Sequence, residues 1–174
     1  AWWKENKPEP IDVTPMDTSV TGIWNTTDIL DLENNKLAGA LKAAIPSFGG
    51  KVTHFAGMAE SEDIPNPAGF AIPIYYYDQH MENNGLWDVV DEMLADDEFH
   101  ADPAVRDQKL EALREAIADA PVDPELLEMV EAKIYDRTAS GESHTTRTRF
   151  RSSPNAEDVN GFNGAGLCSS ASGD

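Results

Sequence analysis

The sequence predicts an α+β fold in which a mostly helical layer covers a small sheet. Several stretches between residues 36 and 134 place apolar side chains three or four positions apart, the spacing of one helix face. Two shorter stretches, 70–74 and 145–151, are rich in strand-forming residues. Because each element must bury its apolar side, we expect these few strands to pack beneath the helices.

The charge balance narrows the kinds of ligand that the chain can bind. Its 174 residues, enough for one domain with a core, include 13 Lys and Arg against 32 Asp and Glu, for a net charge of −19. This argues against a nucleic-acid binder and against an anionic-membrane binder, since both need a basic footprint. A phosphate ligand stays compatible, because it needs only a few local cations and N–H groups.

Two further features concern the compartment. No apolar run is long enough to cross a membrane or to act as a secretory leader. Cys168 is the single cysteine, which excludes an internal disulfide and fits a reducing cytoplasm. A nucleophilic role for Cys168 is disfavoured, since no histidine lies near it in the sequence. We therefore expect a cytoplasmic protein.

Residues 1–35 are predicted to lack regular structure. Pro8, Pro10 and Pro15 interrupt any helix or strand. The segment is nevertheless too apolar for a free linker, with apolar side chains at Trp2, Trp3, Ile11, Val13, Met16, Val20, Ile23 and Trp24. We expect it to wrap against a domain formed by residues 36–174, or to be the tail of a preceding domain.

A Gly-Gly-Lys sequence separates the first two predicted helices. The first helix, 36–45, is expected to end at Pro46. Gly49 and Gly50 then stand just before the N-terminus of a second helix, where free N–H groups and the helix dipole attract anions. Lys51 adds a positive charge. The alternative is a flexible turn with a solvated lysine, and the Gly-Gly-Lys residues by themselves favour this alternative. Their spacing is not that of a Walker-type phosphate-binding loop.

The middle of the chain is predicted to be structural. A short buried strand is expected at 70–72, then a helix that begins near Tyr75–Tyr77 and ends near Asn84, with Gly85 as its C-cap. The tyrosines are interpreted as packing residues. Three more helices follow, one at 86–94 and two that begin at the cap sequences Asp102-Pro103 and Asp123-Pro124.

No metal site is predicted in this region. The sequence Asp96-Asp97-Glu98 is expected to be a solvated acidic turn. The histidines are scattered and lack the spacing of metal ligands; they are His54, His80, His100 and His144.

An arginine-rich strand is predicted near the C-terminal end. Alternation places Thr146, Thr148 and Phe150 on one face, and Arg147, Arg149 and Arg151 on the other. Arginine supplies planar, permanently charged donors, which suit a polyphosphate. Hydroxyls, an acidic pair that could hold a metal or anchor an arginine, and a Gly-rich loop follow. The alternative is an edge strand with solvated arginines and an ordinary surface loop, which composition alone favours.

Two separated motifs resemble the nucleotide-binding half of the pyruvate phosphate dikinase and phosphoenolpyruvate synthase family. One is Arg151-Ser152-Ser153, followed by Glu157-Asp158 and by the loop that contains Gly161, Gly164 and Gly166. The other is the Gly49-Gly50-Lys51 helix, followed by the Pro-containing turn and strand of residues 64–73. The resemblance covers residues 36–174.

The resemblance implies an ATP-grasp fold, of which this chain holds the first subdomain with a helical insert. Lys51 and Arg151 are implied to contact the phosphates of ATP. The resemblance implies further binding residues at Gly49, Gly50, Ser152, Glu157, Asp158 and Gly164. Arg149 is added as a candidate only because it lies on the same strand face as Arg151. The family passes a phosphoryl group from ATP to a histidine, and from there to pyruvate, a glucan or a small hydroxyl compound.

The resemblance also implies partners outside this chain. The carboxylates for Mg²⁺ would come from the second ATP-grasp half, and the phosphohistidine from a separate domain, so none of the four histidines inherits that role. We therefore expect little or no activity from this chain alone. The alternatives are a truncated, non-catalytic nucleotide-binding or assembly module, and an unrelated acidic helical domain in which both motifs are coincidences.

Overall fold

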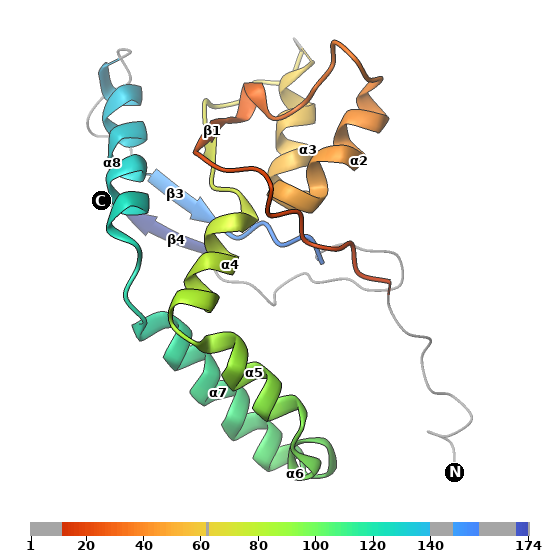
Figure 1. The fold of residues 1–174 in the computed structure, drawn as a ribbon. Coiled ribbons are helices and arrows are strands. Elements are labelled where there is room, and N and C mark those ends of the chain that lie inside the picture. The colour runs from red at the N-terminus through yellow and green to blue at the C-terminus, as the bar shows by residue number, and fades with distance from the viewer. Residues whose placement is uncertain (1–11, 62, 140–147, 157–169, 174) are drawn as a thin grey trace.

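The computed structural model describes residues 12–61, 63–139, 148–156 and 170–173, and it is mostly helical with two small antiparallel sheets (Figure 1). This agrees with the predicted α+β class. The elements in chain order are β1 (Trp24–Asn25), the 3₁₀ turn η1 (Thr26–Asp28), α2 (Leu37–Phe48), α3 (Gly50–Ala59), β2 (Phe70–Ala71), α4 (Ile74–Asn83), α5 (Leu86–Leu94), α6 (Asp97–Ala101), α7 (Pro103–Asp119), α8 (Pro124–Ala139), β3 (Thr148–Arg151) and β4 (Ser170–Gly173).

The two sheets contain two strands each. Strand β1 pairs with β2, with Trp24 opposite Ala71, and β3 pairs with β4, with Phe150 opposite Ala171. An edge-to-face contact between Phe70 and Phe150, with ring centroids 6.4 Å apart, joins the two sheets. The strands therefore form two short ribbons in contact, where a single small sheet was expected.

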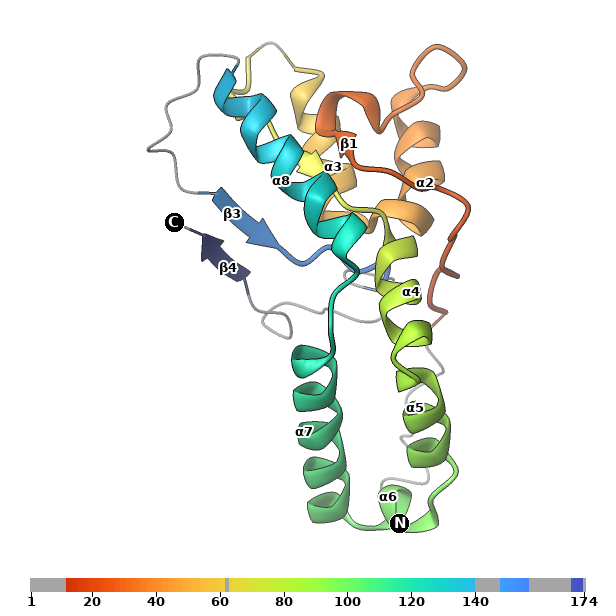
Figure 2. The same cartoon turned by 60° about the vertical axis from the view of Figure 1, so that its left-hand side comes forward.

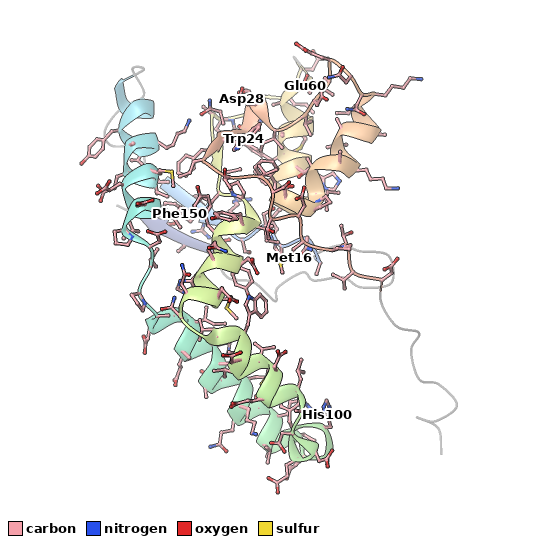
Figure 3. The ribbon with its side chains drawn as sticks, viewed as in Figure 1. Met16, Trp24, Asp28, Glu60, His100 and Phe150 are labelled. Atoms are coloured by element: carbon pink, nitrogen blue, oxygen red, sulfur yellow. The ribbon has the colours of Figure 1, made fainter. Side chains whose placement is uncertain are left out.

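The core lies between α2, α3 and the turn that precedes them. Small residues let the two helices approach closely, because Ala40, Ala44 and Ala56 are all buried at their interface. Phe48 closes this core and contacts Trp24 edge to face, at 5.7 Å between ring centroids. Figure 3 shows Trp24 on the α2 and α3 side of the molecule.

Helix α2 does not end at Pro46 as expected, but continues to Phe48. Proline lacks one N–H group, and near a C-terminus this removes a single helical bond. The carbonyl of Pro46 accepts the N–H of Asp17, at 3.0 Å. The helix ends where Gly49 takes a φ of 80° and donates its N–H to the carbonyl of Ile45, at 2.8 Å.

Residues 86–119 form a helical arm that projects from the core (Figures 1 and 2). The C-cap of α4 is Asn84, one residue before the predicted Gly85, and Gly85, with a φ of 65°, is the N-cap of α5. Helix α7 packs along α5 and α6, and the side chain of Phe99 in α6 is buried in this arm. His100 lies at the far end of the arm (Figure 3).

The acidic sequence in this arm is a helix start rather than a turn. Asp96 accepts the N–H of Glu98 at 2.9 Å and so caps α6, and it also pairs with Lys109 of α7. The pKa of the Asp96 carboxyl is lowered, mainly by the hydrogen bond from Lys109 and secondly by the hydrogen bond from the Glu98 N–H. The two predicted caps are confirmed, since Asp102 accepts the N–H of Ala104 and Asp123 that of Glu125.

The described part of the N-terminal segment contacts several helices. Ser47 donates a hydrogen bond to the carboxylate of Asp17, at 2.9 Å. Gly22 donates its N–H to the hydroxyl of Tyr76, also at 2.9 Å, and that hydroxyl in turn contacts Met129 of α8. Tyr76 thus joins the segment to two helices. None of the helices in the described ranges is both long and apolar enough to cross a membrane.

Candidate functional site

The two motifs singled out in the sequence meet in the structure. The N–H of Val52, in the first turn of α3, donates to the hydroxyl of Ser153 at 2.9 Å, across 101 positions of sequence. The N–H of Gly50 donates to the carbonyl of Pro154 at 3.3 Å. Figure 1 shows the segment after β3 running to the ends of α2 and α3 that meet at Gly49. The Gly-Gly-Lys and Arg-Ser-Ser motifs are therefore in contact.

Gly49 makes this approach possible. It is the C-cap of α2 and the N-cap of α3, with a φ of 80° and a ψ of 166°. A Cβ atom at this position would lie 1.6 Å from the carbonyl oxygen of Ser153 and 2.7 Å from its hydroxyl. Both the left-handed φ and the contact exclude a side chain. Thr53 of α3 also stabilises the turn, because its hydroxyl donates to the carbonyl of Gly49 at 2.7 Å.

The start of α3 presents fewer free donors than expected. The N–H groups of Gly50 and Val52 are already bonded, to Pro154 and Ser153 respectively. The expectation of free N–H groups is therefore wrong for these two residues, because a distant segment caps the helix. Lys51, the second residue of the helix, carries an exposed side chain at the same helix end.

The cross-strand register agrees with the predicted alternation for the described residues of β3. Phe150 contacts Phe70 although 37% of its surface is exposed, and the exposed Arg149 and Arg151 lie on the opposite face of the strand. Their cross-strand partners on β4 are Ser172 and Ser170, and directly opposite residues share a face. The Arg149 guanidinium donates to the Ser172 hydroxyl at 2.7 Å. This face, called here the arginine face, combines two guanidinium groups with two hydroxyls.

Ser152 and Ser153 have different environments. The hydroxyl of Ser153 is used by the Val52 N–H, whereas the hydroxyl of Ser152 is buried and finds no hydrogen-bond partner within the described part of the chain. A buried polar atom without a partner costs about 1–3 kcal/mol, so a ligand or a water molecule would stabilise it. Ser152, predicted as a binding residue, thus has an unused donor beside Arg151.

Sequence reasoning missed several residues that build this site. No separate role was predicted for Ser153, yet its hydroxyl makes a contact between the two motifs. Asn155 is buried, with 8% of its surface exposed, and its amide donates to the carbonyl of Thr14. Ser170 and Ser172 were also missed, because small residues carry a weak strand signal.

Other predicted site residues fall outside the described ranges. They are Glu157, Asp158 and Gly164, and the motif residues Arg147, Gly161 and Gly166 also lie there, as do His144 and Cys168, to which no role was assigned. Over the part that is described, no group of three or more His, Cys, Asp or Glu side chains gathers in a way that could hold a metal ion.

A lysine in the first turn of a helix, whose neighbours bond to the segment after an arginine-bearing strand, is an arrangement suited to phosphate and hence to nucleotide ligands. Comparison with known families shows the same class. The model of the pyruvate phosphate dikinase AMP/ATP-binding domain matches residues 45–171, which include both motifs. The chain belongs to this family of nucleotide-binding domains. Neither the curated proteins nor the solved structures include a match to the chain.

Proposed function

We propose that the chain is the ATP-binding part of a dikinase-type phosphotransferase. The observation that supports this most directly is the contact between the two motifs, in which the N–H groups of Gly50 and Val52, on either side of Lys51, bond to the segment that follows Arg151. The family of nucleotide-binding domains to which the chain belongs supports the choice of ATP. Residues 36–174 would form the first portion of an ATP-grasp domain, with the preceding segment wrapped against it.

The residues have distinct roles in this proposal. Lys51 and Arg151 bind phosphate oxygens, and Gly49 and Gly50 keep the backbone close to them. Ser152 donates its unused hydroxyl. A second group of residues is proposed to shape the phosphate end; it comprises Arg149, Glu157, Asp158 and Gly164. Phosphoryl transfer needs mainly positioning and charge stabilisation, which cations on the phosphate oxygens supply.

The transfer itself requires groups beyond this chain. Mg²⁺ would supply charge neutralisation on the phosphates, held by carboxylates of the second half of the ATP-grasp domain. The phosphoryl group would pass to a histidine on a separate domain and then to pyruvate or a related acceptor. In this arrangement the present chain binds and orients ATP.

Calorimetric titration with ATP and Mg²⁺ tests the proposal. Lys51→Ala and Arg151→Ala should each weaken binding about 10- to 100-fold, since hydrogen bonds to charged groups contribute roughly 1.5–3 kcal/mol. Lys42→Ala and Arg114→Ala remove exposed cations of α2 and α7 and should leave the affinity unchanged. Equal losses in the controls would point to bulk charge and contradict the assigned roles.

Two further outcomes discriminate between functions. Binding by the wild-type chain with no phosphoryl transfer, even when the second half of the domain and a phosphohistidine domain are supplied, would favour a non-catalytic nucleotide-binding or assembly module. No ATP binding, with or without the second half, would overturn the proposed function.

A further inference from the structure

We propose that Ser153 is a positioning residue that holds Lys51 in register with Arg151 by capping α3 from a distant part of the chain. This inference rests on the proposed function, because it concerns the two cations assigned to the phosphates of ATP. It adds a residue whose hydroxyl would act through those cations rather than on the nucleotide.

The first step of the argument is that α3 lacks a cap of its own. The residue at its N-cap position is Gly49, which has no side chain and makes no capping hydrogen bond. A capping side chain normally accepts the N–H of the second or third helical residue. Val52 is the third residue of α3, and its N–H donates to the Ser153 hydroxyl. Ser153 therefore fills the role of the missing cap.

The second step is that the contact fixes the helix start at more than one point. The N–H of Gly50 donates to the carbonyl of Pro154, and the backbone of Gly49 packs directly on Ser153. Asn155 then ties the same segment to the carbonyl of Thr14. The residues on both sides of Lys51 are thus bonded to the segment that follows Arg151.

The third step concerns the two cations. Lys51 directly precedes Val52, and Arg151 lies two residues before Ser153. The hydrogen bond between Val52 and Ser153 is therefore a short link between the backbones that carry them. Two cations held in a fixed arrangement lose less conformational freedom when a polyphosphate binds, so the affinity is higher. Without the hydroxyl, the start of α3 would be free to shift relative to β3.

The test compares Ser153→Ala with a matched control. Asp102→Ala removes the cap of α7 in the helical arm, where the Asp102 carboxylate accepts the N–H of Ala104 at 2.8 Å. Both variants should lower the melting temperature by a few degrees. Only Ser153→Ala should weaken ATP binding, by roughly tenfold, and Ser153→Thr should restore it because threonine also caps helices.

A double-mutant cycle shows whether Ser153 acts through Lys51. In the Lys51→Ala background, the further change Ser153→Ala should weaken ATP binding by much less than tenfold, since the group that it positions is absent. The same loss in both backgrounds would overturn the inference. So would wild-type affinity in Ser153→Ala, or an equal loss in Asp102→Ala. If the wild-type protein binds no ATP even when the second half of the domain is supplied, the proposed function fails and this inference with it.

Discussion

A Cβ atom at Gly49 would lie 1.6 Å from the carbonyl oxygen of Ser153, so the turn between α2 and α3 and the segment after β3 fit together only with glycine at this position. The obstructing atom belongs to the backbone, and no side-chain rotation relieves the contact. Gly49 also has a φ of 80°, which is unfavourable for other residues.

Gly49→Ala should therefore destabilise the protein strongly. Overpacking and a left-handed backbone together cost about 3 kcal/mol or more, unless the segment after β3 detaches. Urea denaturation measures this loss. Gly85→Ala is the matched control, because Gly85 has a φ of 65° but nothing within 4 Å of an added Cβ, so only the backbone cost of about 1–2 kcal/mol applies. Equal losses in the two variants would show that the contact with Ser153 does not form.

Tyr76→Phe tests the contact between the N-terminal segment and the helices. The Tyr76 hydroxyl accepts the N–H of Gly22 in a partly buried position. Its removal should lower the free energy of unfolding by about 1 kcal/mol and should accelerate hydrogen exchange at the Gly22 amide. Tyr75→Phe is the control, since the Tyr75 hydroxyl makes no hydrogen bond within the ranges described. Unchanged exchange at Gly22 in Tyr76→Phe would contradict the contact.

Local signals in the sequence predicted the local structure well. The Asp-Pro caps at Asp102 and Asp123 lie where expected, because such caps depend on neighbouring residues alone, and the predicted C-cap Gly85 is one residue beyond the C-cap of α4, Asn84. The prediction that α2 ends at Pro46 was wrong, because Pro46 lies in the last turn, where its missing N–H group removes a single helical bond. A proline therefore marked the last turn of α2 but not its end.

Longer-range features could be predicted only through the family resemblance. Alternation in β3 was visible from Phe150 and its neighbouring arginines, but its partner strand consists of Ser, Ala and Gly, which seldom indicate a strand. The resemblance placed Lys51 and Arg151 at one site, and the structure brings their motifs together. It did not predict the bond between Val52 and Ser153, which depends on backbone geometry across 101 positions.

Acid should weaken the helical arm through Asp96. Hydrogen bonds from Lys109 and from the Glu98 N–H lower the pKa of this carboxyl in the folded protein. Its stabilising contribution is therefore present above the unfolded pKa of about 3.9 and is lost as the pH falls through the lower folded value. Asp96→Asn should be less stable than the wild type at pH 7, and the gap should shrink below about pH 4.

Urea denaturation of both proteins between pH 7 and pH 2.5 measures that gap. Lys109→Met removes the cationic partner of the same ion pair. It should also reduce the loss of unfolding free energy on acidification, compared with the wild type. A gap between wild type and Asp96→Asn that stays constant down to the lowest pH would contradict the assigned role of the carboxylate.

The arginine face leads to the last prediction. Arg149 shares this face with Arg151 and donates a hydrogen bond to Ser172. If the phosphates of ATP lie along the face, Arg149→Ala should weaken ATP binding several-fold. The loss should be smaller than in Arg151→Ala, because Arg151 directly precedes the segment that caps α3. Arg149→Lys should recover only part of the loss, because lysine lacks the planar pair of donors. Titration of the same variants with AMP should show a smaller effect, since AMP has fewer phosphates to contact. Unchanged ATP affinity in Arg149→Ala would confine the phosphate contacts to Arg151 and Lys51, and would leave the bond to Ser172 as a purely structural link between β3 and β4.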